Sequence, residues 1–389
     1  MEIESHNKGF DTTEKSYRGR EGMKKISQME PWIGEEEKRA MMEYLDSGGW
    51  LTEFRKTREF EQMIADYTGS KHASVVSNGT VSLIIALMAL GIKGEDEVIV
   101  PDYTMIASAN AVVLVGAKPV LVDIDPANLC LDLHSAEESV TPRTKAIMYV
   151  SINGRCHDMN RVVDLARRHN LYLIEDAAQS LGSGYQGKHL GTFGNIGSFS
   201  FSFPKIITTG QGGALVTDSE ELSRRIAMIK DFGRPKSGLD YHEIMGLNSK
   251  FTDLQAVIGV EQMKKLGWRV NRKKEIYQFY RDLLQGVEEV RLIDTDLEDT
   301  APWFVDILVL GGEKERDSLA SFLDARGIGA RPFYPAIHTQ PPYSWVKGKF
   351  KNSESISQRG LWLPSSSFLT DEDIERICEE IRNYFRGQK

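Results

Sequence analysis

Short apolar runs alternate with helix-like stretches through the middle of the chain. Five runs rich in β-branched residues predict strands, and two longer stretches predict helices. The strands are expected at 73–77, 97–100, 119–124, 145–150 and 171–175, and the helices at 80–90 and 161–169. Because these runs lack polar alternation, each strand should be covered on both faces. Strands that alternate with helices in this way favour a mostly parallel central sheet covered by helices, an α/β fold.

Beyond about residue 260 the pattern changes to long charged helices separated by strand-like segments. Helices are expected at 271–285, 313–327 and 371–385, and strands at 303–310 and 330–337. This pattern predicts a smaller α+β domain. We expect a large domain at 26–265, whose first segment (about 26–50) packs with the small domain, and a small domain at 266–389. Residues 1–25 are polar and are expected to form a mobile tail.

Composition and charge exclude several classes of protein. The net charge of -8 and the lack of a long basic stripe argue against a nucleic-acid partner. No apolar run approaches the roughly 18 residues of a membrane helix, so no membrane partner is expected. The N-terminus lacks the apolar core of a signal peptide. Three scattered cysteines do not form a disulfide framework, which favours a reducing compartment, the cytoplasm.

A candidate anion site lies where the strand at 73–77 meets the next helix. Asn78, Gly79 and Thr80 join the two elements. A helix N-terminus presents unpaired N–H groups, and glycine lets an anion approach the backbone. The segment is therefore either a phosphate cradle or a simple helix cap.

Two charged residues that suit catalysis, Asp176 and Lys205, each come after a predicted strand. Asp176 comes directly after the strand at 171–175, where α/β proteins collect their sites, although it could equally cap a helix. In SFSFSF (198–203) the serines share one strand face and the phenylalanines the other, which should pack into the core. Lys205 follows Pro204. A lysine held near a buried sheet has a lowered pKa and becomes nucleophilic, whereas an ordinary loop lysine is solvated.

Two other motifs do not carry a site. GSGYQGKH (182–189) begins like a nucleotide phosphate loop, but His189 replaces the serine or threonine that binds magnesium. Cys156, His157 and Asp158 are adjacent, so they cannot easily surround one ion, and no second cluster has zinc-like spacing. We therefore expect no metal.

The motifs together, in their order along the chain, are more specific than any one of them. The series contains five motifs in chain order: Gly-Thr at a helix start, EDAAQ (175–179), SFSF…K…TTGQGG, GLNSKFTDLQAVIGVEQM (246–263) and ARPFYPAIHTQPPY (330–343). This series resembles the DegT/DnrJ/EryC1/StrS family of pyridoxal-phosphate-dependent sugar aminotransferases. The resemblance runs from about Ile26 to near the C-terminus and implies the fold-type-I architecture.

The resemblance also implies a role for each matching residue. Lys205 would hold pyridoxal 5′-phosphate through a Schiff base, and Asp176 would pair with its ring nitrogen. The remaining expected contacts are Gly79, Thr80 and Ser200 at the phosphate, Gln179 near the phenolic oxygen, Met105 against the ring, Asn248 from a neighbouring subunit, and Tyr334 and His338 at the substrate. Relatives usually have an aromatic residue at the Met105 position, so Tyr103 is the alternative there.

The implied reaction transfers the amino group of L-glutamate to a keto sugar carried on a nucleotide, within a homodimer whose sites are shared. The expected acceptor is a GDP-linked 4-keto-6-deoxyhexose, which would become a 4-amino-4,6-dideoxy sugar. A 3-keto sugar or a dTDP- or UDP-linked one is the alternative. A sugar dehydratase of the same fold would have histidine in place of Lys205, and a non-catalytic regulator would not need Lys205, Asp176 and Asn248 together.

Overall fold

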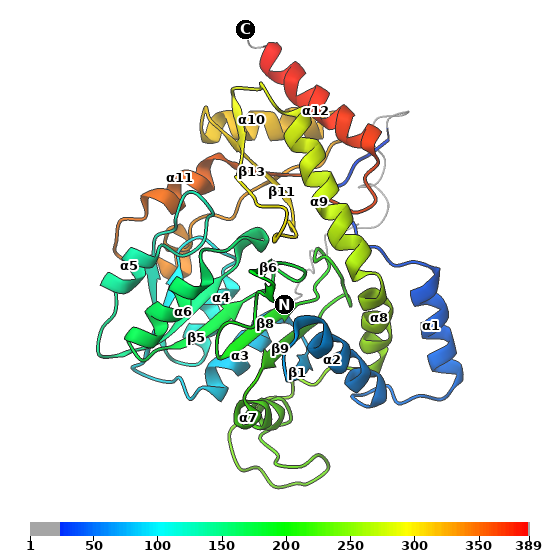
Figure 1. The fold of residues 1–389 in the computed structure, drawn as a ribbon, viewed down its shortest axis with the longest axis vertical. Helices are drawn as coiled ribbons and strands as arrows, with labels where there is room; N and C mark the ends of the chain where they lie inside the picture. Colours follow the sequence, from blue (N-terminus) through cyan, green and yellow to red (C-terminus); the bar gives the residue numbers. More distant parts are fainter. Residues whose placement is uncertain (1–23, 388–389) are drawn as a thin grey trace, which may run out of the picture.

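A seven-stranded sheet forms the centre of the first two thirds of the protein (Figure 1). The computed structural model describes residues 24–387, so most of the expected tail at 1–25 lies outside the described residues. The strands follow the order β1-β9-β8-β5-β4-β2-β3. Their bounds are β1 His72–Val76, β2 Glu97–Pro101, β3 Lys118–Val122, β4 Thr144–Val150, β5 Tyr172–Asp176, β8 Ile196–Ser200 and β9 Gly213–Thr217.

One strand of this sheet runs against the others. Strands β8, β5, β4, β2 and β3 pair in parallel, whereas β9 is antiparallel to both β8 and β1. The expectation of a mostly parallel sheet is confirmed. Because β1 and β8 point in the same direction, the carboxyl ends of six strands share one edge.

Helices cover both faces of the sheet, and alternate residues of β4 show how. Ala146 and Met148 lie in the apolar cluster of α3, α4 and α7, whereas Ile147 and Tyr149 lie in the cluster of α6. Both sets are buried, as the unbroken apolar runs predict. The helices are α3 Gly79–Ala89, α4 Ala107–Leu114, α5 Leu133–Glu138, α6 Met159–Arg168 and α7 Glu220–Lys230.

A second, antiparallel sheet of four strands lies above the first in Figure 1, with the order β10-β11-β13-β12. Helices α9, α10 and α12 pack in one apolar cluster with it. The bounds are β10 Val290–Leu292, β11 Val305–Val309, β12 Arg331–Pro332, β13 Gly360–Leu363, α9 Leu266–Leu283, α10 Glu313–Asp324, α11 Lys351–Arg359 and α12 Asp371–Arg386. The strand expected at 330–337 is wrong beyond Pro332.

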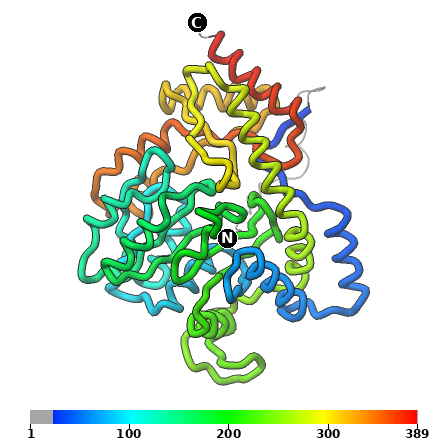
Figure 2. Tube along the Cα trace, in the orientation of Figure 1, coloured from blue at the N-terminus to red at the C-terminus, as the bar shows by residue number. Residues whose placement is uncertain are grey.

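The N-terminal part of the described chain touches both regions. Ile26 forms a parallel bridge with Ile328, and Lys24 pairs with Asp373 at 2.7 Å, so the start of the blue trace lies beside the red helix α12 in Figure 2. The helix α1 packs instead against α8. The bounds are α1 Glu35–Asp46, α2 Arg55–Thr68 and α8 Asp253–Lys264. The division at residue 265, between α8 and α9, stays a prediction.

The SFSFSF segment is a shorter strand than expected. Strand β8 ends at Ser200, and the chain then turns, with the Lys205 N–H donating to the Ser202 carbonyl at 3.0 Å. Phe199 and Phe201 are buried, but Phe203 is 48% exposed, so the prediction that all three pack in the core is wrong at Phe203. The turn that brings the chain back to β9 carries Phe203 outward.

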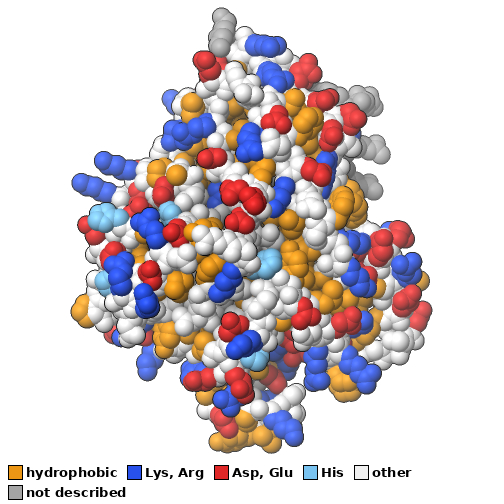
Figure 3. All heavy atoms as spheres, viewed as in Figure 1, with side chains coloured by type: hydrophobic (Ala, Val, Ile, Leu, Met, Phe, Trp, Pro, Cys, Tyr) orange, Lys and Arg blue, Asp and Glu red, His pale blue; other side chains and the backbone are white. Residues whose placement is uncertain are grey.

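Within residues 24–387, no helix is long and apolar enough to cross a membrane. Basic and acidic side chains are mixed over the face seen in Figure 3. Apolar side chains gather at its lower end, where the loop after α7 projects. The exposed apolar residues of this loop include Leu239, Tyr241, Ile244 and Met245.

Candidate active site

The carboxyl edge of the large sheet brings three expected residues together. Asp176 is the last residue of β5, and Ser200 is the last residue of the neighbouring β8. The register pairs Asp176 with Ser198, two residues before Ser200. Gly79 begins α3 after β1, whose end lies at the same edge. In an α/β sheet this edge is where ligands bind.

The start of α3 is a tight backbone cradle. Asn78 caps the helix, its Oδ1 accepting from the Val81 N–H at 2.9 Å. A Cβ on Gly79 would lie 2.9 Å from the Ser200 Cβ, and one on Gly213 would lie 2.5 Å from the Asn78 carbonyl oxygen. Both positions therefore require glycine, and the helix start lies against the end of β8. Thr80 is half-buried in the first turn.

Asp176 is a buried carboxylate with few partners. Its Oδ2 accepts from the Ser108 hydroxyl at 2.6 Å, and its Oδ1 accepts from the Ala178 N–H at 3.2 Å. Burial raises the pKa of Asp176, whereas these hydrogen bonds and the charge of Lys205 lower it. No helix begins at 177–180, so the alternative that Asp176 caps a helix is wrong.

Lys205 is half-buried and lies over an aromatic ring. Its Nζ is 3.8 Å from the centroid of the Trp303 ring. Burial lowers the pKa of Lys205 to about 7, Asp176 acts in the opposite direction, and Arg331 lowers it further. An amine with this pKa is neutral in a large fraction of molecules near pH 7, which makes it a nucleophile.

Trp303 links the lysine turn to the second sheet. Its indole N–H donates to the Pro204 carbonyl at 2.6 Å. The buried ammonium of Lys273, on α9, donates to the Trp303 carbonyl at 2.7 Å and to the Ser365 carbonyl. Burial and the charge of Arg269 lower the pKa of Lys273 to about 7. The sequence shows Trp303 only as part of a strand-like run, so its position beside the lysine could not be foreseen.

Gln179 is held in place by the loop after β4. Its Oε1 accepts from the Asn153 N–H at 2.8 Å. The Asn153 side chain accepts from the Phe304 N–H at 2.6 Å and donates to the Phe304 carbonyl at 2.8 Å. Asn153 has a φ of 53°, a left-handed conformation that asparagine tolerates better than most residues. It joins Gln179 to the same segment that carries Trp303.

The two expected substrate residues have different surroundings. Tyr334 is buried, its ring centroid lies 4.7 Å from that of Trp362, and burial raises its pKa. His338 has its Nδ1 2.7 Å from Asp102 and its Nε2 3.3 Å from Glu354. Each ring nitrogen of His338 thus interacts with a carboxylate, and these contacts hold the segment around His338 in place.

The remaining expected contacts lie at the border of the site. Met105 is 46% exposed, and its carbonyl accepts at 3.1 Å from the N–H of Ser108, the residue whose hydroxyl donates to Asp176. Tyr103 is fully buried, with its ring 5.8 Å from that of Phe333. Met105 is therefore the more accessible of the two.

Asn248 lies beside the strand that leads to the cradle. It is exposed, and it forms a backbone bridge with Asp231. The next residue, Ser249, accepts from the Ser77 N–H at 3.0 Å. Asn248 thus stands at the base of the projecting loop of residues 232–247. The role expected for Asn248 in a neighbouring subunit stays a prediction.

The residues present fit pyridoxal phosphate. Gly79 and Ser200 form a cradle at a helix N-terminus, which suits a phosphate group. Asp176 is a buried carboxylate that would pair with a protonated ring nitrogen, and Lys205 is an amine of lowered pKa that can react with an aldehyde. These groups match the phosphate, the ring nitrogen and the aldehyde of the cofactor.

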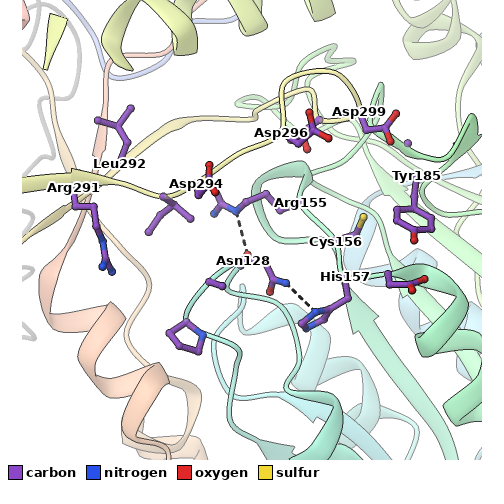
Figure 4. Close-up of a pocket in the computed structure, with 16 residues that line it drawn as sticks. Asn128, Arg155, Cys156, His157, Tyr185, Arg291, Leu292, Asp294, Asp296 and Asp299 are labelled. Atoms are coloured by element: carbon purple, nitrogen blue, oxygen red, sulfur yellow. Dashed lines mark hydrogen bonds between the residues drawn. The ribbon is translucent and has the colours of Figure 1, made fainter. Parts of the chain in front are cut away.

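A separate cavity of about 550 Å³ lies between the loop after β4 and the segment at 291–300 (Figure 4). Arg155 and the adjacent Cys156, His157 and Asp158 line it. The His157 Nδ1 is bonded to the Asn128 amide at 2.9 Å, as the dashed line shows. Within residues 24–387 no group of three or more His, Cys, Asp or Glu side chains could hold a metal ion.

An α/β sheet of this topology, with a lysine of lowered pKa and a buried aspartate at its carboxyl edge, fits a pyridoxal-phosphate-dependent transferase of fold type I. The sequence profile of the DegT/DnrJ/EryC1/StrS aminotransferase family matches residues 31–382. The chain belongs to this family of aminotransferases.

Named relatives are similar over almost the whole chain. A GDP-perosamine synthase of Escherichia coli O157:H7 is 38% identical over 363 residues, which cover 93% of this chain and 99% of the relative. A GDP-perosamine synthase of Caulobacter vibrioides is 38% identical over 359 residues, with 91% and 96% covered. The crystal structure of S. venezuelae DesV in complex with a ketimine intermediate is 34% identical, with a TM-score of 0.84, and the match covers 90% of this chain and 94% of that one.

Proposed function

We propose that the protein transfers the amino group of L-glutamate to a nucleotide-linked keto sugar, a GDP-linked 4-keto-6-deoxyhexose, and forms a perosamine-like 4-amino-4,6-dideoxy sugar. The observation that carries the chemistry is the position of Lys205, which lies in the turn after β8 with its amine 3.8 Å from the Trp303 ring centroid, at the sheet edge where β5 ends in the buried Asp176. Burial there lowers the pKa of Lys205 to about 7. The choice of GDP and of C4 is supported by the names of the relatives that are 36–38% identical.

The cofactor of this reaction is pyridoxal phosphate, which supplies an electron sink for bonds to the amino-bearing carbon. Lys205 would bind its aldehyde carbon covalently, and Asp176 would keep a proton on its ring nitrogen. Gly79, Thr80 and Ser200 would hold the phosphate. Gln179 would contact the phenolic oxygen, and Met105 would cover the ring.

Once the amino donor has taken its place, the free Lys205 amine can accept a proton from one carbon and return it to another. A pKa near 7 suits both steps, because the amine loses and gains a proton at small cost near neutral pH. The face of Trp303, 3.8 Å away, stabilises the ammonium form when the proton is on Lys205.

The proposal includes a homodimer in which Asn248 of one subunit completes the phosphate site of the other. Its support is the exposed position of Asn248 and the apolar side chains on the adjoining loop, such as Tyr241 and Met245. Tyr334 and His338 are proposed on the substrate side. The division into residues 26–265 and 266–389, and a cytoplasmic location that suits three free cysteines, belong to the same proposal.

The experiment combines colour with product analysis. Purified protein supplied with pyridoxal phosphate should turn yellow, bleach on addition of L-glutamate, and then aminate one of a panel of GDP-, UDP- and dTDP-linked keto sugars, identified by mass spectrometry. The Lys205→Ala variant should not take up the colour covalently. No colour in the wild type, or covalent colour that persists in Lys205→Ala, would reject the proposal and favour a non-catalytic protein of this fold.

A further inference from the structure

Lys273 is a buried lysine without an acidic partner. It lies on α9 and is only 2% exposed. Within residues 24–387 no Asp or Glu side chain forms an ion pair with it, whereas the similarly buried Lys230 pairs with Glu53 and Glu61. Lysines are seldom fully buried unless they are paired, because burial costs the amino group its solvation. The place of Lys273 in the core therefore has to be explained by the other contacts of its amino group.

The amino group of Lys273 links the two central strands of the second sheet just beyond the end of their pairing. The strands β11 and β13 are antiparallel, and Val305 lies opposite Leu363. Continuing this register by two residues places Trp303 opposite Ser365. The Lys273 Nζ donates to the Trp303 carbonyl at 2.7 Å and to the Ser365 carbonyl. A neutral amine has two N–H groups and an ammonium has three, so either form can hold both strands together.

Trp303 carries this link on to the reactive lysine. Its indole N–H donates to the Pro204 carbonyl at 2.6 Å, and its ring centroid lies 3.8 Å from the Lys205 Nζ. Trp303 is itself only 4% exposed, so its ring shields one side of the amine from water. The main chain of Trp303 is thus held by Lys273, while its side chain contacts the Lys205 turn.

We propose that Lys273 is a positioning residue of the active site, whose amino group fixes the Trp303 main chain and thereby keeps the indole over the Lys205 amine. The inference rests on the proposed function in taking Lys205 as the reactive amine. The next residue, Phe304, is held from another side, because its N–H and carbonyl bond to the Asn153 side chain at 2.6 and 2.8 Å. With both neighbouring main chains fixed, the Trp303 ring has little freedom to leave the amine.

The Trp303 ring has two opposite effects on the protonation of Lys205. The ring helps to bury the amine, and burial lowers the pKa of Lys205. Its face also attracts an ammonium, which raises that pKa. Burial can change the pKa of a lysine by about 3–5, whereas a cation–π contact changes it by about 1. Loss of the cover therefore outweighs loss of the attraction, and a displaced ring should leave Lys205 with a higher pKa.

The test compares Lys273→Met with Lys273→Arg and with Lys274→Met. Lys274 is the next residue of α9 and donates to the Glu298 carbonyl at 2.7 Å in an exposed position, so it is the matched control. Competitive acetylation of pyridoxamine-phosphate-loaded protein over a range of pH, read by peptide mass spectrometry, measures the pKa of the free Lys205 amine. Lys273→Met should raise this pKa by about 1, Lys273→Arg should restore most of the wild-type value, and Lys274→Met should match the wild type.

The rate of pyridoxal-phosphate loading provides a second readout, which a general loss of structure would not reproduce. At about pH 7 Lys273→Met should load roughly fivefold more slowly than the wild type, because less of its Lys205 is neutral, and by about pH 9 the two rates should converge. Asp176 and Arg331, whose charges also act on Lys205, are unchanged in every variant. Equal slowing at both pH values, or an unchanged pKa of Lys205 in Lys273→Met, would overturn the inference.

A double variant separates positioning from a direct effect of charge. Loss of a nearby positive charge also raises the pKa of a lysine, without any movement of Trp303. In protein that already carries Trp303→Leu, adding Lys273→Met should therefore change the pKa of Lys205 little. A shift as large as in the wild-type background would assign Lys273 a direct electrostatic effect and reject the positioning role. If the pKa shifts as expected but no keto sugar accepts nitrogen, the proposed acceptor fails and the inference about Lys273 stands.

Discussion

The buried ion pair between Arg155 and Asp306 offers a sharp test of how the two sheets are joined. Arg155 follows β4, Asp306 lies in β11, and both are almost fully buried. The two guanidinium N–H groups donate to the two carboxylate oxygens at 2.6 and 3.1 Å. The Arg155 Nε also donates to the Asn128 carbonyl at 3.1 Å, which Figure 4 shows at the wall of the cavity. We predict that Arg155→Met is among the more destabilising single changes in the protein.

The expected magnitude follows from what Arg155→Met leaves behind. Asp306 keeps one hydrogen bond, from the Tyr277 hydroxyl at 3.1 Å, but loses its counter-charge in a buried position. Removing one partner of such a pair costs about 3–5 kcal/mol in the free energy of unfolding. With an unfolding entropy of about 0.8 kcal/mol/K for a chain of this length, the melting temperature should fall by roughly 4–6 °C.

The assay is urea and thermal unfolding of the cofactor-loaded protein, with Arg143→Met as the control. Arg143 pairs with Glu97 at 2.8 Å from an exposed position, and Glu97 keeps Lys118 as a partner, so the control should lose less than about 1 kcal/mol. The double variant Arg155→Met with Asp306→Leu should regain part of the loss, because no buried charge is left unpaired. Equal losses in the two single variants would refute the reasoning.

The cradle, the carboxylate and the lysine each give a further prediction. Gly79→Ala places a methyl group 2.9 Å from the neighbouring strand and should weaken pyridoxal-phosphate binding in equilibrium dialysis, whereas Gly267→Ala, with no atom within 4 Å, should not. Ser108→Ala removes a hydrogen bond that favours ionised Asp176, so the pKa of that carboxyl should rise and cofactor affinity should fall about tenfold in the same dialysis. Because the pKa of Lys205 is lowered to about 7, its neutral fraction grows as the pH rises through 7, and cofactor loading of the apoprotein should speed up and level off above about pH 8. A loading rate that climbs steadily to about pH 10 would contradict the lowered pKa.

The sequence predicts the large sheet well because its strands are buried on both faces. Apolar runs such as those of β4 and β5 have few explanations other than a covered parallel strand, and each appears at the expected place. The errors fall where the backbone leaves regular structure. Pro204 lies within the turn Ser202–Lys205, which the alternation of serine and phenylalanine does not reveal, and the prolines after Arg331 limit β12 to two residues.

The residues of the candidate site also fall into two groups, those that the sequence predicts and those that it does not. Gly79, Asp176 and Lys205 could be predicted as candidates because each lies at or shortly after the end of a strand and has a residue type suited to its chemistry. Ser108 and Trp303 could not, because their roles depend on contacts made across the fold. Ser108 reaches Asp176 over 68 positions, and the Trp303 indole reaches the lysine turn over 99. A single sequence carries no signal for such pairs.

The hydrogen bond from the Trp303 indole to the Pro204 carbonyl has a mechanical consequence. Trp303 leads into β11 of the second sheet, while Pro204 immediately precedes Lys205 in the turn that follows β8 of the first sheet. Any rotation of one sheet against the other must either break this bond or pull the lysine turn with it. The reach of the reactive amine is therefore set jointly by two halves of the chain, and a change in their relative orientation is transmitted to the Lys205 amine.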